Sequence, residues 1–338
     1  MDLACSYKEK DLLDLSFCIP EEIQLILAGK NLTTVGKVLK TSKVDLISYG
    51  LTEEEADMVK SSVSVNVPCT TFMTVLEYSS ILATKWRHIT FRCPALDRIT
   101  CNGLPLRGIT EIVGESGCGK SQICLQLALN VQLSLADGGL GKSAVYICTE
   151  DVFPSKRLVQ IAEFYKKEYR YDKWLDNIFI EHCPDSDNLM NCICNRLPIL
   201  MNKHSIGLVI IDSIAGAFRI DGDAIIRADN MRKLVFKLQE LADEHECGIV
   251  CVNQVTASMN ETIRNRCVPS LGLAWSNLVT TQLKIRKTYK QVSKLEDSTI
   301  LSTPIKVRSI EIGFSPELPN SFAEFIITEQ GICDVPRN

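Results

Sequence analysis

The chain lacks several features that would place it in a common class of protein. It has no net positive charge, because 37 Lys and Arg stand against 41 Asp and Glu and give a formal charge of -4. Proteins that coat nucleic acid without sequence preference are usually basic overall. No window contains the roughly 18 apolar residues of a membrane helix, and the opening MDLACSYKEKDLLDL has no apolar stretch typical of a signal peptide. We therefore expect a soluble intracellular protein that contacts DNA, if at all, through local basic loops.

The chain also lacks a CxxC pair, although it contains 15 cysteines. Cys192 and Cys194 are too close together for the usual spacing of zinc ligands. Other cysteines stand within apolar runs, such as Cys148 in VYICTE and Cys251 in IVCVNQ. A reduced, buried cysteine behaves as a small hydrophobic residue. We therefore expect free cysteines and a reducing compartment.

A length of 338 residues favours one large domain with a small appendage. Residues 1–65 have the pattern of short helices, one of them over 31–44, and Thr52 and Glu55 form a capping box. Two of these helices, joined by a turn that contains Gly50, make a helix-hairpin-helix pattern. Such a hairpin either presents backbone amides to a phosphate or only contacts protein. Pro68 breaks the last helix, so residues 66–85 are predicted to be a linker.

From residue 86 to residue 338 the pattern changes to strands that alternate with helices. Near-continuous apolar strands separated by helices indicate a parallel sheet covered on both faces. The expected strands are 108–114, 143–150, 177–183, 206–213 and 247–254, and the expected helices are 121–136, 154–165, 187–201 and 228–245. The last segments alternate as antiparallel strands do, over 278–288, 304–313 and 321–331.

The most specific motif is GESGCGKS, from Gly114 to Ser121, which fits the P-loop pattern GxxxxGK(S/T). An apolar strand precedes it and a helix follows, as a P-loop requires. The pattern predicts that Lys120 places its charge on the phosphates of a nucleoside triphosphate and that Ser121 ligates Mg²⁺. The backbone amides of the loop and the positive end of the helix would face the same phosphates. These amides belong to Gly114, Glu115, Ser116, Gly117, Cys118, Gly119, Lys120 and Ser121.

Three polar residues end apolar strands and are expected to complete this site. Asp212 follows four apolar residues and is predicted to hold Mg²⁺ through water. Glu150 would polarise the attacking water, and it is preferred over Asp151 because consecutive strand residues point to opposite sides. Gln254, next to Asn253, either senses the γ-phosphate or satisfies a loop backbone.

Two polar segments carry the arginines that we expect to contact DNA. One contains Arg219 and Arg227 and follows Asp212, while the other contains Arg264 and Arg266 and follows Gln254. Long loops without periodicity are usually functional or disordered. Each segment is either a DNA contact or a solvated surface loop.

Taken in order, these motifs resemble the RecA family and, within it, the eukaryotic recombinase paralogues. The segments VYICTEDVFPSKRL, IVCVNQVT and LGLAWSN carry the closer similarity, and the resemblance covers essentially the whole chain. It implies a RecA-like P-loop ATPase core with a mostly parallel central sheet, behind a small all-α domain. It also implies a nuclear protein, with the cytoplasm as a second location. That protein would use ATP and Mg²⁺ to assemble with another paralogue on single-stranded or junction DNA and would assist the main recombinase in homologous recombination repair of double-strand breaks.

The resemblance also assigns individual residues. Arg157 matches the family's arginine that stacks on adenine, and Pro316 lies in a segment similar to the one that closes a neighbouring subunit's nucleotide. Phe72 and Val75 match an oligomerisation peptide in the linker, with Val where the family has Ala. Two departures concern activity: Asp151 replaces a small residue after the catalytic Glu, and the second basic segment is nearly free of glycine. The first implies weak DNA-dependent ATP hydrolysis, and the second implies that DNA follows a different path from that in the main recombinase.

Three other functions are compatible with the P-loop. The first is a self-sufficient RecA-type ATPase that carries out strand exchange by itself. The second is a small-molecule kinase, although no arginine-rich lid is evident in the sequence. The third is a scaffold that binds ATP without catalysis.

Overall fold

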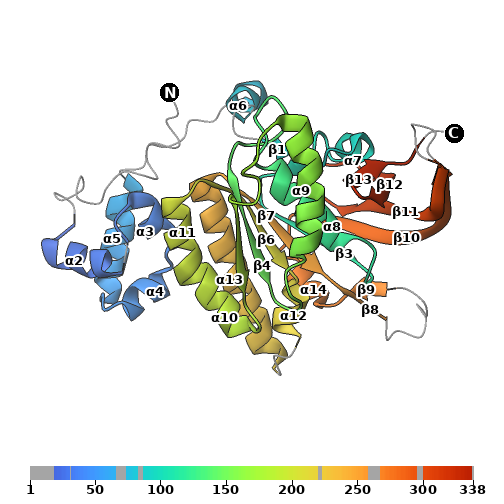
Figure 1. Ribbon diagram of the computed structural model, residues 1–338. Coiled ribbons are helices and arrows are strands. Elements are labelled where there is room, and N and C mark those ends of the chain that lie inside the picture. Colours follow the sequence, from blue (N-terminus) through green and yellow to red (C-terminus); the bar gives the residue numbers. More distant parts are fainter. Residues whose placement is uncertain are drawn as a thin grey trace. The chain divides into compact units, whose positions relative to one another are not determined.

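A computed structural model describes residues 19–30, 32–65, 74–82, 87–219, 223–257, 267–294 and 300–336 (Figure 1). The chain forms two compact units, Met1–Ile81 and Leu82–Asn338. Phe72, Arg264 and Arg266, to which the sequence assigns contacts, lie outside the described residues. None of the described helices is long and apolar enough to cross a membrane.

The first unit contains α2 (Glu21–Gly29), α3 (Val35–Lys40), α4 (Lys43–Ser48) and α5 (Glu53–Val65). The single helix expected over 31–44 is wrong, because Thr41 has extended backbone and Ser42 caps α4 by accepting a hydrogen bond from Asp45 N. The capping box is confirmed, since Glu55 Oε2 accepts from Thr52 N at 2.7 Å and Thr52 Oγ1 accepts from Glu55 N at 3.3 Å.

The predicted linker contains a helix, α6 (Val75–Leu82). Thr74 and Glu77 form a second capping box, with Thr74 N donating to Glu77 Oε2 at 2.7 Å and Glu77 N donating to Thr74 Oγ1 at 3.2 Å. The T-x-x-E spacing in the sequence is typical of a helix N-terminus and could have predicted this helix. The linker predicted over 66–85 thus includes a short helix, and its role as a linker stays a prediction.

The second unit is built on a nine-stranded sheet in the order β13-β12-β11-β10-β3-β7-β6-β4-β5 (Figure 1). The six strands from β10 to β5 are parallel, and β11, β12 and β13 add to the β10 edge in antiparallel pairs. The predicted α/β fold with a mostly parallel central sheet is confirmed. The strands are β3 (Ile109–Gly114), β4 (Ser143–Cys148), β5 (Ile178–His182), β6 (Ile206–Asp212), β7 (Gly248–Asn253), β10 (Thr281–Lys294), β11 (Ile300–Phe314), β12 (Phe322–Thr328) and β13 (Gly331–Asp334).

Successive residues of the central strands point to opposite faces, and each face is covered by helices. On β6, Leu208 and Ile210 pack in one core with α7 (Pro94–Ile99), α8 (Lys120–Asn130) and α9 (Ser155–Tyr169). Val209 and Ile211 pack in the other core. The helices of that second face are α10 (Ser186–Asn191), α11 (Leu197–Lys203), α12 (Ile214–Phe218), α13 (Ala224–His245) and α14 (Gly272–Ser276).

All four helices differ from their predicted bounds. The helix expected over 154–165 continues to Tyr169, and the one expected over 228–245 begins at Ala224. The helix expected over 121–136 ends at Asn130, and the following residues form turns closed by bonds such as Leu140 N to Val131 O. The helix expected over 187–201 is interrupted by a π-helical turn at Cys192–Arg196, directly before α11. Pro198, in the first turn of α11, has no N–H to continue the i to i−4 bonds, which explains the interruption.

Two short strand pairs complete the second unit. The pair β1 (His88–Ile89) and β2 (Leu104–Pro105) is antiparallel, and so is the pair β8 (Val255–Ala257) and β9 (Cys267–Pro269). The second pair follows β7 directly, at the end of the sheet where Asp212 and Asn253 end their strands.

Candidate nucleotide-binding site

The glycines of the motif are required by the backbone that joins β3 to α8. Gly117 and Gly119 have φ of 71° and 109°, in the left-handed region that residues with a Cβ rarely adopt. Gly114 is required for a different reason: a Cβ there would lie 2.4 Å from the Ile285 carbonyl oxygen of β10. The loop therefore curls back tightly between the strand and the N-terminus of α8, where backbone amides can face an anion.

Lys120 lies inside this loop. Its side chain is buried, at 9 % exposure, and Nζ donates to Gly114 O at 2.7 Å and to Glu115 O at 2.9 Å. Two backbone carbonyls of the loop therefore hold the ammonium group within it. A point charge at this position suits the binding of phosphate groups.

Asp212 lies at the C-terminal end of β6 and is partly exposed. Its Oδ2 accepts one hydrogen bond from Ser121 Oγ at 2.6 Å and another from Tyr146 OH at 2.6 Å. The structure thus brings together the two residues that the sequence assigns to Mg²⁺. The sequence does not predict the contact of Tyr146 with Asp212. Burial, and then the neighbouring Cys124 and Asp212, raise the pKa of Tyr146 well above its ordinary value, so its hydroxyl keeps its proton and donates.

The oxygens of Ser121 and Asp212 fit Mg²⁺, which prefers hard oxygen ligands and usually keeps several waters and substrate phosphates in its shell. Within the described part of the chain no group of three or more His, Cys, Asp or Glu could hold a metal by itself. These residues would therefore supply only part of the coordination of a nucleotide-bound magnesium.

Glu150 and Gln254 meet beside the ends of β4 and β7. Gln254 Nε2 donates to Glu150 Oε2 at 2.6 Å. Arg219 NH2 donates to Gln254 Oε1 at 2.6 Å and lies 3.6 Å from Glu150 Oε1. Two residues assigned to catalysis and one assigned to DNA thus form one polar cluster. Because β4 ends at Cys148, the alternation of strand residues does not reach Glu150 or Asp151, and the catalytic role of Glu150 stays a prediction.

Arg157 lies on α9, and its side chain contacts both α8 and the turn that joins β12 to β13. Its Nε donates to Gln122 Oε1 at 2.7 Å, NH1 to Glu329 O at 3.0 Å and NH2 to Thr328 O at 2.5 Å. Burial lowers the pKa of Arg157. The guanidinium is held in a fixed plane, as stacking requires, and its role at an adenine stays a prediction.

Two further cations reach the loop from distant strands. A Cβ added at Gly117 would lie 3.5 Å from Lys287 Nζ of β10, and one added at Gly119 would lie 3.5 Å from Arg308 Cδ of β11. Burial lowers the pKa of Arg308. Their closeness to the loop depends on how β10 pairs with β3, so no local motif in the sequence indicates it.

The remaining predicted contacts lie elsewhere on the described chain. Arg227 is in the first turn of α13. Pro316 is exposed in the turn between β11 and β12, where Glu317 pairs with Arg107 at 3.1 Å. Val75 is 84 % exposed at the start of α6. Their roles stay predictions.

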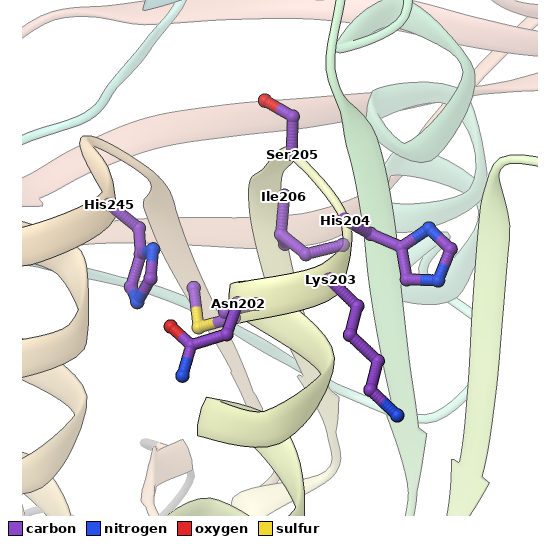
Figure 2. A pocket seen from close by; sticks show the side chains of 7 residues that line it. Asn202, Lys203, His204, Ser205, Ile206 and His245 are labelled. Carbon is purple, nitrogen blue, oxygen red and sulfur yellow. The ribbon is translucent and has the colours of Figure 1, made fainter.

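A hollow of about 270 Å³ lies at the opposite end of β6 (Figure 2). Ligands of open α/β sheets bind at the carboxyl ends of the strands, whereas this hollow surrounds the start of one. The side chains of His204 and His245 do not converge on a common point in Figure 2. We therefore place no substrate there. The lining residues are Met201, Asn202, Lys203, His204, Ser205, Ile206 and His245.

The cysteines agree with the sequence analysis. The eleven cysteines whose side chains the structure describes are free, and most of them are buried. Burial raises the pKa of Cys148 and of Cys247 to about 12. Such thiols stay protonated at neutral pH and act as small hydrophobic residues.

Comparison with known proteins agrees with this geometry. The Rad51 family profile matches residues 84–335. DNA repair protein XRCC3 of Bos taurus is 36% identical over 266 residues, covering 74% of this chain and 75% of the relative. XRCC3 of Mus musculus is 35% identical over 272 residues, covering 74% and 76%. DNA repair protein rhp57 of Schizosaccharomyces pombe is 33% identical over 280 residues, covering 70% and 76%.

The sequence segments VYICTEDVFPSKRL, IVCVNQVT and LGLAWSN resemble, in particular, the third X-ray-repair cross-complementing protein. The similarity to XRCC3 confirms this expectation, together with that of a RecA-like recombinase paralogue. The chain belongs to the Rad51 family.

Proposed function

We propose that this chain is a recombinase paralogue that binds MgATP and acts in homologous recombination repair of DNA double-strand breaks. The observation that carries the proposal is the contact of Ser121 with Asp212 at the end of a P-loop that already encloses Lys120. The relatives named as DNA repair proteins support the biological process.

Each residue of the site has a chemical task in this proposal. The amides from Gly114 to Ser121 and the Lys120 ammonium bind the phosphates. Ser121 and Asp212 would hold Mg²⁺, which neutralises charge on the phosphate oxygens when bound. Glu150 orients and deprotonates the attacking water, and Gln254 contacts the γ-phosphate. Arg157 stacks on the adenine.

The polar cluster at Glu150 supports a link between nucleotide and DNA. Arg219 cannot bind a DNA phosphate fully while it donates to Gln254 and pairs with Glu150. DNA that attracts Arg219 would therefore free both residues for the nucleotide. Hydrolysis would be weak without DNA, because Arg219 then holds Glu150 and Gln254. Arg227, Arg264 and Arg266 would add further contacts to single-stranded or junction DNA.

Assembly with another paralogue is the second half of the proposal. The Phe72–Val75 peptide and the Pro316 segment would contact neighbouring subunits, and ATP between subunits would hold the assembly on DNA beside the main recombinase filament. The boundaries 1–65, 66–85 and 86–338 describe the organisation proposed for this role. The proposed location is the nucleus, with the cytoplasm as a second site.

The test is to purify the full chain with its partner in MgATP and to count the subunits by mass photometry. We expect a heteromer that dissociates in ADP and does not form with Lys120→Ala. Lys142→Ala is the matched control, because Lys142 Nζ also donates to two backbone carbonyls, His245 O and Glu246 O, at the other end of the sheet. Normal assembly and repair by Lys120→Ala would contradict the proposal. Steady ATP hydrolysis and filaments of the chain alone would instead favour a self-sufficient strand-exchange ATPase.

A further inference from the structure

Glu111 is a carboxylate buried beneath the phosphate-binding loop. It lies on β3, three residues before Gly114, and its side chain has no exposed surface. Oε1 accepts from Asn253 Nδ2 at 2.7 Å and from Trp275 Nε1 at 2.9 Å, and Oε2 accepts from Gln282 Nε2 at 2.6 Å. These donors belong to β7, α14 and β10. One side chain therefore joins three elements to the strand that enters the loop.

This buried hydrogen-bond network lowers the stability of the fold unless every donor and acceptor in it has a partner. A buried carboxylate without partners is strongly destabilising, and every buried donor that loses its acceptor is destabilising as well. The indole of Trp275 has a single donor and no acceptor, so it depends on this carboxylate. Apolar side chains of similar size at all four positions would fill the same space without these requirements. The four polar groups are therefore informative about function.

Asn253 extends the network toward the nucleotide. Its Oδ1 accepts from Gln254 N at 2.8 Å and from Ser270 Oγ at 2.7 Å. Because Nδ2 must donate to Glu111 and Oδ1 must accept, the amide cannot rotate by half a turn without losing these bonds. Glu111 therefore fixes the orientation of Asn253, and Asn253 fixes the backbone of Gln254.

The network also reaches β9. Ser270 follows β9 directly, and its N donates to Gln254 O at 2.9 Å. Strands β8 and β9 pair antiparallel, with Val255 opposite Pro269. A movement of Gln254 thus acts on both strands at once. Those strands flank the segment that contains Arg264 and Arg266.

We propose that Glu111 is a positioning residue that transmits the state of the nucleotide site to β8, β9 and α14. This inference rests on the proposed nucleotide site. A γ-phosphate competes with Glu150 for the Gln254 side chain, so its arrival displaces Gln254. Because Glu111 anchors Asn253 to the sheet, the displacement passes to Ser270 and β9 and does not dissipate along β7.

The experiment measures amide hydrogen exchange of β8, β9 and α14 in the full chain, with and without ATPγS and Mg²⁺. Nucleotide binding is measured in parallel with a fluorescent ATP analogue. Glu111→Gln replaces one acceptor oxygen with a donor, and Ser270→Ala removes only the bond between Asn253 and β9. Thr110→Val is the matched control, since Thr110 is equally buried on the same strand and its hydroxyl has no hydrogen-bond partner.

When two sites are coupled, a ligand at one site typically changes the affinity of the other by about 5–150-fold. We therefore expect ATPγS to slow exchange in wild type and in Thr110→Val by about fivefold or more. In Glu111→Gln and Ser270→Ala the change should fall below about twofold while nucleotide affinity stays within about threefold of wild type. If Glu111→Gln does not fold, the exchange measured in Ser270→Ala tests the proposal. A wild-type response in either folded variant would overturn the role of Glu111. If wild type binds no nucleotide, the proposed function fails and this inference fails with it.

Discussion

Two carboxylates in the parallel part of the sheet have opposite surroundings. Asp212 ends β6, is partly exposed and accepts from the hydroxyls of Ser121 and Tyr146. Glu111 lies within β3, is fully buried and accepts only from N–H groups. A hydroxyl can turn its lone pairs toward a cation, whereas an amide or indole N–H cannot. The first carboxylate is therefore suited to Mg²⁺, and the second to holding strand ends in place.

The largest expected effect comes from removing the buried carboxylate. Glu111→Met has a similar shape but no acceptor, so three buried donors lose their partner. We expect the free energy of unfolding to fall by about 3–5 kcal/mol, measured by urea denaturation. A loss below about 1 kcal/mol would mean that the donors find other acceptors and that the contrast with Asp212 is smaller than its geometry indicates.

A second prediction concerns the partly exposed carboxylate. Asp212→Asn keeps an oxygen but removes the charge that attracts Mg²⁺, so the affinity for ATP in magnesium should fall about 10–100-fold, as a lost interaction of about 1.5–3 kcal/mol implies. The affinity in EDTA should not change. The control is Asp229→Asn, which alters another partly exposed carboxylate, paired with Lys233 at 2.8 Å. An equal loss with and without magnesium would contradict the metal assignment.

Tyr146→Phe sharpens the comparison, because it removes one donor of Asp212 and leaves Ser121. The cost of one hydrogen bond is about 0.5–1.5 kcal/mol. We expect that decrease in the free energy of unfolding, together with magnesium-dependent ATP affinity within about threefold of wild type. A loss of affinity as large as that of Asp212→Asn would show that the phenol is essential to the metal site.

The smallest expected effect is that of Thr110→Val, next to Glu111 on β3. The Thr110 hydroxyl is buried and has no hydrogen-bond partner, so its removal should leave the free energy of unfolding within about 0.5 kcal/mol of wild type or raise it slightly. Chemical denaturation compares the two proteins directly. A marked destabilisation would show that β3 does not tolerate substitution in general, and would weaken conclusions drawn from Glu111.

The same comparison explains what could be predicted from the sequence. The loop from Gly114 to Ser121 is a local motif, and Asp212 ends an apolar run at the edge where parallel strands bring their carboxyl ends together. Gln254 could be placed by the same argument. The α/β core with a mostly parallel sheet followed from the alternation of strands and helices, whereas its RecA-like character followed from the resemblance of the motifs to that family.

Other features depend on contacts between distant segments. Glu111 meets Gln282 only because β10 pairs with β3 in one register, across 171 residues. Lys287 and Arg308 reach the loop through the same sheet edge. Tyr146 reads as an ordinary core residue of β4, because nothing local shows that its hydroxyl contacts Asp212. No pattern within a short window contains this information.

The most direct test of the account is calorimetric titration of the full chain with ATP, in magnesium and in EDTA, for wild type and Lys120→Ala. We expect one site per chain, tighter binding in magnesium, and a loss of affinity of about tenfold or more in Lys120→Ala. Binding that is unaffected by both magnesium and Lys120→Ala would contradict it.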